Sequence, residues 1–295
     1  MVETNAKAVF ITGCSTGIGY EGALHLDRLG YHVFAGVRRE QDAQALRKAA
    51  SAHLFPIIMD VKDKSAIAGA AALVAAKAGA EGLYAIINNA GVVMSAPIEF
   101  VSTEELLAPL EVNLIACIHV IQAFLPLLRQ GRGRIINITS IGGRQSVPFM
   151  GPYCASKAAM EAISDSMRME LRQFGIPVVI VCPGNIKTSI WGKTVNSTDA
   201  QLIKLPPQAA ALYHKSIQAL IKTETRMGRS GSPPMLVART LERILAVKKP
   251  NPRYIVGLDA KIQVLMARFL PDGMRDWIIR LFTGNIFTFK KGVRW

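Results

Sequence analysis

Tyr153 and Lys157 stand four positions apart in a stretch with helical spacing, which places their side chains on one face about one turn apart. An ammonium group near a phenol favours the phenolate and moves a pKa of about 10 toward the pH at which the phenol exchanges protons efficiently. The pair could therefore serve as a general acid and base. Taken alone, a tyrosine and a lysine at this spacing are more often an ordinary helix surface, so their context decides.

Two more polar residues stand where such chemistry would need them. Ser140 comes just after an apolar run that predicts a buried strand ending at Ile138, and ligands bind at the carboxyl edge of a doubly wound sheet. Its hydroxyl could hold a substrate oxygen and stabilise the charge that develops there. Asn113 falls inside a predicted helix, where an amide is unfavourable unless it is hydrogen-bonded. A turn serine and a satisfied core asparagine are the competing interpretations.

A glycine-rich segment between a predicted strand, Ala8–Ile11, and a predicted helix, Gly17–Leu29, indicates a dinucleotide site. Glycines let the backbone turn tightly and approach a pyrophosphate, while the helix amino terminus offers unpaired N–H groups and a positive dipole end. Such a segment can also be a simple turn, but the flanking strand and helix favour a cofactor. The residues expected to contact the cofactor here are Gly13, Ser15, Thr16, Gly17, Ile18 and Gly19.

The end of the second predicted strand bears on the choice between NADP(H) and NAD(H). Val37 occupies the position where an acidic residue would hold the ribose hydroxyl of NAD, and Arg38 or Arg39 could pair with the 2′-phosphate of NADP. NADP(H) is therefore favoured, with NAD(H) as the alternative, although both arginines could instead be solvated. Asp60 and Val61 follow the third strand, where they could contact the adenine; Asp60 could equally cap the next helix.

Short apolar, β-branched runs alternate with helical stretches, which predicts an α/β fold with a doubly wound parallel sheet of the Rossmann type. The predicted strands are Ala8–Ile11, His32–Val37, Leu54–Met59, Ala85–Ile87, Arg134–Ile138, Val178–Val181 and Tyr254–Val256. Helices are predicted at Gly17–Leu29, Gln41–Ala49, Lys64–Ala78, Glu104–Leu128, Tyr153–Phe174, Gln208–Thr223 and Met235–Val247, with Pro126 ending or bending the fourth. We expect one domain, residues 1–260, with a helical cover over the substrate at about 189–234 and an extension at 261–295.

The ordered motifs from about Lys7 to Thr188 resemble the short-chain dehydrogenases/reductases in their compact form. They are the glycine pattern at 13, 17 and 19, Asn88-Asn89-Ala90-Gly91, Asn113, Ser140, Tyr153-xxx-Lys157 and Pro183-Gly184. The resemblance implies hydride transfer between a nicotinamide cofactor and a carbonyl or alcohol, with Tyr153 as the acid and base and Ser140 on the substrate oxygen. It also implies that Lys157 binds the nicotinamide ribose and that Asn113 holds a water leading from Lys157 to solvent.

The same resemblance assigns further cofactor contacts and an oligomer. The residues that would border the cofactor beyond the fourth strand are Asn89, Ala90 and Gly91, and Asn88 would support the sheet centre. After the sixth strand, Pro183 and Gly184 would border the cofactor, and a backbone group of Ile186 and the hydroxyl of Thr188 would hold the nicotinamide carboxamide; Thr188 could instead cap a helix. Family members commonly pair through two long helices, so Glu104–Leu128 and Tyr153–Phe174 are expected at the interface of a homodimer or tetramer.

Composition argues against several other classes. The formal net charge is +14, but the basic residues are scattered and not interleaved with stacking aromatics, so nucleic acid is not an expected partner. The four cysteines show no metal-ligand spacing and no arrangement for thiol catalysis, so neither is predicted. With no signal peptide and no run of about 18 uncharged apolar residues, we expect a reduced, cytoplasmic protein without a spanning helix.

Beyond Thr188 the motifs stop and the substrate is less well defined. Apolar residues there favour a cover over a lipophilic substrate, steroid-, retinoid- or medium-chain ketone-like, as strongly as they favour core packing: Trp191, Leu202, Ile203, Leu205, Leu212 and Tyr213. The tail mixes apolar residues and cations at helical spacing, and packing on the sheet or a partner is favoured over peripheral contact with a membrane. The similarity is loosely to the steroid and retinol dehydrogenase branch. A non-redox member of the fold and a non-catalytic cofactor-binding protein are the rival interpretations.

Overall fold

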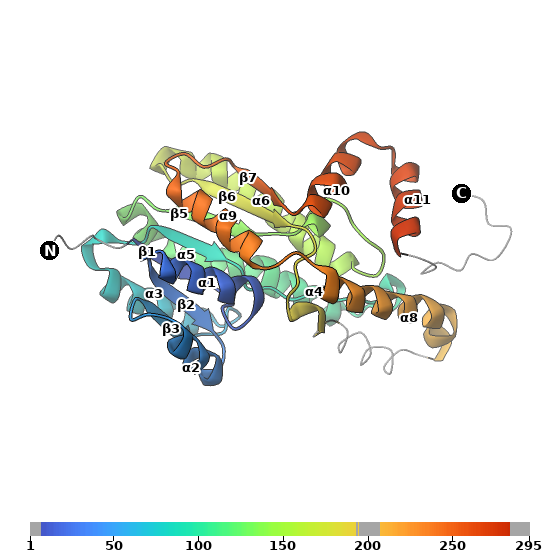
Figure 1. The fold of residues 1–295 in the computed structure, drawn as a ribbon, viewed down its shortest axis with the longest axis horizontal. Coiled ribbons are helices and arrows are strands. Elements are labelled where there is room, and N and C mark those ends of the chain that lie inside the picture. Colours follow the sequence, from blue (N-terminus) through green and yellow to red (C-terminus); the bar gives the residue numbers. More distant parts are fainter. Residues whose placement is uncertain (1–6, 193, 195–206, 284–295) are drawn as a thin grey trace.

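A seven-stranded parallel sheet forms the centre of the computed structural model, which describes residues 7–192, 194 and 207–283 (Figure 1). The strand order is β3-β2-β1-β4-β5-β6-β7. The chain adds strands outward from β1 to β3 on one side and then from β4 to β7 on the other, and this change of side between β1 and β4 is typical of a doubly wound sheet. The strands are β1 Ala8–Ile11, β2 His32–Val37, β3 Leu54–Ile58, β4 Ala85–Asn88, β5 Arg134–Ile138, β6 Val178–Pro183 and β7 Arg253–Val256. The fold class predicted from the sequence is confirmed.

Helices cover both faces of this sheet. The α-helices are α1 Gly17–Arg28, α2 Glu40–Ala49, α3 Lys64–Ala78, α4 Thr103–Leu110, α5 Ala116–Gln130, α6 Gly151–Glu170, α8 Pro207–Ser230, α9 Met235–Ala246, α10 Leu258–Phe269 and α11 Asp272–Thr283. Short helical turns are η1 Gly79–Glu81, η2 Ile98–Phe100, η3 Glu111–Ile115, η4 Ile141–Gly143 and η5 Leu171–Phe174. Helices α1, α2 and α9 share one apolar core with one face of the sheet, and α3, α5 and α6 share a second core with the other face.

Successive residues of β1 show why the strands are continuously apolar. Val9 and Ile11 belong to the core under α1 and α9, whereas Ala8 and Phe10 belong to the core under α3 and α5. Because neighbouring strand residues point to opposite faces, a sheet buried on both sides needs an apolar residue at every position. This burial fixes the carboxyl ends of the strands, where the site lies.

The helix predicted at Glu104–Leu128 is interrupted, which is a correction. The chain forms α4, then the π-helical turn η3, then α5, which continues through Pro126 to Gln130. Pro126 therefore does not end the helix. The π turn begins two residues after Pro109 and contains Asn113, the residue that is unfavourable in a regular helix.

Within the described ranges, the stretch 103–130 is long and apolar enough, by length and composition alone, to cross a membrane. This test counts length and composition alone and tolerates charged residues, so the prediction of no spanning helix stays a prediction. In this structure, apolar residues of the stretch pack in the interior of the protein. Val120, Ile121, Phe124 and Leu128 are buried in the core beneath the sheet.

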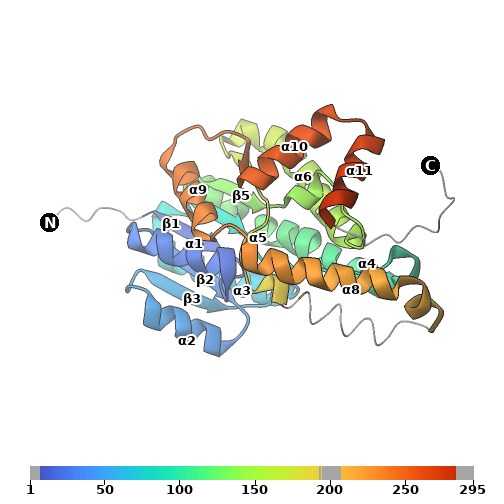
Figure 2. The ribbon, with the colours of Figure 1, turned by 45° about the vertical axis from the view of Figure 1, so that its right-hand side comes forward.

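Helices α8, α10 and α11 lie beyond one end of the sheet, on the right in Figure 1. In the turned view of Figure 2, α8 lies on one side of this end and α10 with α11 on the other. Helix α8 is attached near its end by Asn185 Nδ2, which donates to Met227 O at 2.9 Å. Farther along, Ser95 Oγ donates to Glu224 Oε1 at 2.7 Å, and Tyr213 OH donates to Glu99 Oε2 at 2.8 Å. The predicted cover residues Leu202, Ile203 and Leu205 lie outside the described residues.

Candidate active site

A cavity of about 520 Å³ lies at the carboxyl ends of the strands. It extends from the glycine loop after β1 to the segment after β5 and the amino-terminal part of α6. The predicted site residues that line it are Gly13, Ser15, Thr16, Gly17, Ile18, Arg38, Asp60, Val61, Asn89, Ala90, Gly91, Ser140, Tyr153, Lys157, Pro183, Gly184, Ile186 and Thr188. The predicted residues that do not line it are Gly19, Arg39 and Asn113.

The glycine loop has the shape and the free donors that a pyrophosphate needs. Gly13 and Gly17 have φ angles of +72° and +64°, and a Cβ on Gly13 would lie 2.8 Å from Ala90 Cα. A Cβ on Gly19 would lie 2.3 Å from Gly13 O, so Gly19 keeps the loop closed rather than facing a ligand. The hydroxyl of Thr16, the residue before α1, accepts from Ser189 Oγ at 2.8 Å instead of capping the helix. The first N–H groups of α1 thus remain open to an anion, and the loop fits a dinucleotide.

The loop after β4 is bound directly to the glycine loop. Thr12 Oγ1 accepts from the backbone N–H groups of Asn89 and Ala90, each at 3.0 Å. Asn89 Nδ2 donates in return to Thr12 O at 2.9 Å and Gly13 O at 3.1 Å. These four bonds fix the separation of the two loops, which follow the neighbouring strands β1 and β4. Residues of both loops line the cofactor end of the cavity.

The two arginines after β2 have different surroundings. Arg38 lines the cavity, whereas Arg39 forms a two-bond pair with Asp42, with Nε–Oδ2 and Nη2–Oδ1 distances of 3.0 Å. The sequence did not distinguish them, because the i to i+3 contact depends on where α2 begins. Asp60 lines the cavity and does not cap α3; the cap is Asp63, which accepts from Ser65 N at 2.8 Å.

Tyr153 is enclosed at the opposite end of the cavity. Burial raises the pKa of Tyr153 to about 12, and a hydrogen bond with Ser140 opposes this rise. Ser140 Oγ also accepts from Gly142 N at 3.1 Å, so it caps η4 while it faces the phenol. A Cβ on Gly142 would lie 3.3 Å from Tyr153 Cε1, which shows how closely η4 packs against the ring.

Lys157 lies one turn after Tyr153 on α6, but its partner is not the phenol. Its Nζ atom donates to Ile138 O at 3.0 Å, and burial lowers the pKa of Lys157. The expected downward shift of the Tyr153 pKa by Lys157 is therefore not seen: burial of the phenol is the largest cause of the shift, and Lys157 is not among the groups that cause it. The ammonium lines the same cavity and stays available to a ligand there.

Asn113 is buried and uses its amide to connect three segments. Its Oδ1 accepts from Val92 N at 2.8 Å, and its Nδ2 donates to Val92 O and to Ser156 Oγ, both at 2.9 Å. The π turn η3 brings this amide between the loop after β4 and α6. The side chain thus binds protein groups, and its predicted contact with a water stays a prediction.

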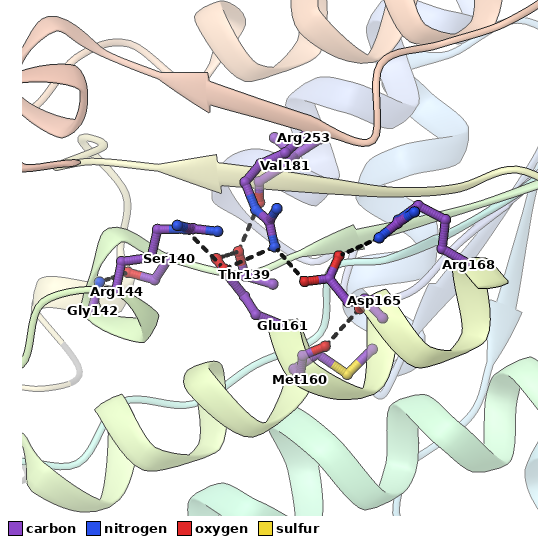
Figure 3. A network of polar contacts seen from close by, with 11 residues as sticks. Thr139, Ser140, Gly142, Arg144, Met160, Glu161, Asp165, Arg168, Val181 and Arg253 are labelled. Atoms are coloured by element: carbon purple, nitrogen blue, oxygen red, sulfur yellow. Dashed lines mark hydrogen bonds and ion pairs between the residues drawn. The ribbon is translucent and has the colours of Figure 1, made fainter. Parts of the chain in front are cut away.

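Sequence reasoning missed a charged cluster behind Ser140, which Figure 3 shows. Glu161, buried on α6, accepts from Thr139 Oγ1 at 3.2 Å and pairs with Arg144 Nε at 2.9 Å and Arg253 Nη2 at 3.3 Å. Arg253, on β7, also pairs with Asp165 at 3.0 Å. Glu161 lies one turn beyond Lys157, so helical spacing could have placed it on the site face. The arginine partners come from distant segments and gave no local signal.

The carboxy-terminal helix α10 also reaches the site, although the sequence division at residue 260 separated most of it. Asp259 and Gln263 line the cavity. Asp259 Oδ2 accepts from Asn185 N at 2.6 Å, next to Gly184 in the segment assigned to the carboxamide. Helix α10 therefore closes the cavity as part of the site and is not only an appendage.

Comparison with known proteins agrees with this geometry. The family model described as short chain dehydrogenase matches residues 7–199. Retinol dehydrogenase 5 of Mus musculus is 36% identical over 281 residues, covering 92% of this chain and 88% of that protein. Human 17-beta-hydroxysteroid dehydrogenase type 6 is 35% identical over 285 residues, covering 92% and 87%. The solved structure of a short-chain dehydrogenase from Streptomyces avermitilis superposes with a TM-score of 0.75 at 27% identity, covering 92% and 94%. The chain belongs to the short-chain dehydrogenase/reductase family and is a nicotinamide-dependent oxidoreductase of alcohol and carbonyl groups.

Proposed function

We propose that this enzyme transfers hydride between NADP(H) and the carbonyl or alcohol carbon of a lipophilic substrate, with Tyr153 exchanging the proton. The observation that carries the proposal is that Tyr153, Ser140 and Lys157 line the same cavity as the glycine loop. A general acid and a cofactor cradle in one cavity are what a coupled proton and hydride transfer requires.

The side chains divide the work as follows. During reduction the neutral phenol of Tyr153 gives its proton to the substrate oxygen and becomes a phenolate, and during oxidation the phenolate takes the proton of the substrate hydroxyl. Burial raises the pKa of Tyr153, which favours the neutral form that reduction needs. Ser140, already hydrogen-bonded to the phenol, holds the same oxygen and stabilises its developing charge. Lys157 stays fixed on Ile138 O and contacts the cofactor ribose, and Asn113 supports α6 from behind. The nicotinamide, when bound, supplies or accepts the hydride.

The preference for NADP(H) over NAD(H) rests on Arg38. It lines the cavity beside Val37 at the end of β2, where an arginine can pair with a 2′-phosphate. Arg39 is committed to Asp42 and supports the loop instead. With neither an aspartate nor a glutamate at position 37, 38 or 39, the segment offers no carboxylate to accept from the ribose hydroxyl that NAD presents.

A lipophilic substrate suits the other end of the cavity. Its lining there is largely apolar and includes Val147, Met150, Ile190, Trp191 and Met227. We assign residues 189–234 as the substrate cover, with α8 as its described part. Relatives named for retinol and 17-beta-hydroxysteroid support a lipid-like alcohol or ketone.

The outer face of α10 adds a peripheral membrane contact to the proposal. Leu258, Ile262, Leu265 and Phe269 follow helical spacing and are 50–74% exposed, so this face does not pack on the sheet. Packing on a partner subunit, the other arrangement that the sequence favoured, stays an alternative to the membrane. Exposed cations, Lys261 and Arg268, flank the stripe, and the one acidic residue of α10, Asp259, turns toward Asn185. An apolar stripe between cations fits an anionic lipid surface.

We also infer a homo-oligomer through the two long helices. Leu107 and Ile115 on α4 and η3, and Met169 on α6, are 43–64% exposed and apolar. Exposed apolar side chains on two neighbouring helices are the usual surface of a symmetric contact.

Tyr153→Phe tests the reaction. The variant keeps the ring that fills the site and removes the proton, so turnover of NADPH with a panel of lipophilic ketones should fall by several orders of magnitude while NADPH binding changes little. Absorbance at about 340 nm measures turnover, and fluorescence titration measures binding. Tight NADPH binding without turnover by the wild type across the panel would support a non-redox member of the fold. Full turnover by the variant would remove Tyr153 from the mechanism.

A further inference from the structure

The substrate end of the cavity contains one buried amide that the proposed reaction does not use. Gln145 lines the cavity and is only 6% exposed. Its Oε1 atom is buried and accepts no hydrogen bond from the described part of the chain. A buried amide oxygen in this state costs about 1–3 kcal/mol, so its presence calls for a partner from outside the chain.

The neighbouring polar groups are already assigned. Ser140 accepts from Gly142 N at 3.1 Å and hydrogen-bonds Tyr153. Asn185 also has a buried oxygen without a protein partner, but it stands in the segment that we assign to the cofactor and its Nδ2 is fixed on Met227 O. Gln263 on α10 also lines the cavity, but it is only half-buried, so water can satisfy its amide. Among the described residues that line the cavity, Gln145 is thus the amide outside the cofactor segment whose buried oxygen lacks a protein partner.

Two contacts fix the backbone at Gln145 and the residue before it. Its backbone N–H donates to Ile141 O at 2.9 Å, and Arg144 before it is fixed to Glu161 at 2.9 Å. Ile141 begins η4, the turn that Ser140 caps. The amide of Gln145 therefore belongs to the same segment as Ser140. Turning the amide by 180° about its last side-chain bond exchanges the positions of its oxygen and nitrogen and leaves one acceptor and one donor group in the same place.

We propose that Gln145 binds a second oxygen function of the substrate, a hydroxyl group on a carbon other than the one that is oxidised or reduced. The unpaired atom is an acceptor and needs a donor, and the amide nitrogen beside it can donate in return, so a hydroxyl complements both. The inference rests on the proposed function, because it takes Tyr153 and Ser140 as the point of reaction. It narrows the substrate class to lipophilic hydroxyketones and diols.

Turnover of a matched series tests the inference. Decan-2-one is compared with its monohydroxylated derivatives, a set of isomers that carry the hydroxyl at each other carbon in turn, using NADPH and the wild-type protein. At least one hydroxyketone should exceed decan-2-one in kcat/KM by about tenfold or more, because a site built for a hydroxyl disfavours the analogue without it. Gln145→Met should lower kcat/KM for that isomer about tenfold more than for decan-2-one. Equal losses on both would overturn the proposal.

Two further measurements do not depend on turnover. With NADP present, decanediols should raise the Tm of the wild type more than decan-2-ol does, and Gln145→Met should erase that difference; equal shifts, including no shift, count against the hydroxyl site. Gln145→Met should also raise the Tm of the cofactor-free protein, because it removes an unpaired buried oxygen. The matched control is Gln130→Met, which removes bonds from Nε2 to Gly79 O and Ala80 O and should not raise it.

These arms separate this inference from the proposed function. Turnover that survives Tyr153→Phe, together with a hydroxyl preference that follows Gln145, would remove the acid and keep the hydroxyl site. Turnover abolished by Tyr153→Phe, with no hydroxyl preference in kcat/KM or Tm, would keep the reaction and remove the hydroxyl site.

Discussion

Arg38 and Arg39 are adjacent in the chain, yet only Arg38 lines the cavity while Arg39 is paired with Asp42. Arg38→Ala should therefore weaken NADPH binding about 10- to 100-fold, the loss of one to two charge-assisted hydrogen bonds, and change NADH binding little. Arg39→Ala is the matched control and should change both cofactors by less than about threefold. Fluorescence titration of each variant with NADPH and NADH gives the Kd values. Equal weakening of NADPH and NADH by Arg38→Ala would rule out a contact with the 2′-phosphate.

Tyr153 should titrate unusually late in the cofactor-free protein. Burial raises its pKa to about 12, above the ordinary value of 10.0, so the folded state favours the neutral phenol. The stability that this preference contributes is present below pH 10 and is lost as the pH rises toward 12, because the unfolded chain ionises first. The tyrosinate absorbance of the wild type minus that of Tyr153→Phe should show no ionisation of Tyr153 below about pH 10. A step in this difference near pH 8 would show that the cavity is more polar than the structure indicates, and a repeat with NADP measures the effect of the cofactor.

At the scale of elements, Glu161 connects the helix that carries Tyr153 to the strand end that carries Ser140. Removing its charge leaves Arg144 and Arg253 without their buried partner, so Glu161→Gln should lower the free energy of unfolding by about 2–4 kcal/mol. Because the relative position of Tyr153 and Ser140 loosens, kcat should fall by about tenfold or more while the Kd of NADPH stays within about twofold. Glu170→Gln on the same helix removes an exposed carboxylate that binds Ser166 and should leave kcat unchanged. Loss of stability with unchanged kcat would reduce Glu161 to a structural role.

The regular elements were predictable because the central strands are buried on both faces and are therefore mostly apolar. Strands β1, β2 and β5 and helix α3 have the predicted bounds, and the other strands differ by one or two terminal residues. The π turn was not predictable in the same way. Asn113 signalled an irregularity, but its cause is a long-range bond to Val92, which helix propensity does not contain. The prediction that Pro126 ends the helix failed for a similar reason, since the tertiary packing of α5 outweighs the tendency of proline to break a helix.

At the scale of the whole molecule, the residues that belong to local motifs were found from the sequence, whereas those that distant segments supply were not. The glycine loop and Asn89 fall at strand ends, and Tyr153 lies near the start of the helix that leads to β6, so the fold brings these motifs together. Arg253 and Asp259 reach the site only after the chain has returned from α8 through α9. Residues so distant in sequence show no periodicity or spacing with the motif, and their role depends on the completed sheet.

The position of α10 between the cavity and solvent leads to the last prediction, on membrane binding. One side of this helix lines the cavity through Asp259 and Gln263, and the other exposes the apolar stripe, so a lipophilic substrate would reach the cavity from the lipid side. Burial of Leu265 and Phe269 in lipid should contribute about 1.5–3 kcal/mol each, and each flanking cation about 1 kcal/mol on an anionic surface. The protein should therefore sediment with vesicles of phosphatidylcholine and phosphatidylserine more than with phosphatidylcholine alone.

Changing both Leu265 and Phe269 to serine should reduce that binding at least about tenfold, since two buried apolar side chains are lost. Turnover of a water-soluble ketone should persist, because neither residue lines the cavity. Leu73→Ser, at a residue 43% exposed on α3, is the control for an apolar surface residue away from the stripe and should not alter vesicle binding. Vesicle binding that survives the double change would show that another surface meets the lipid. If the double change instead reduces the size of the oligomer, the stripe contacts a second copy of the chain, because either lipid or a second copy can bury the same apolar area.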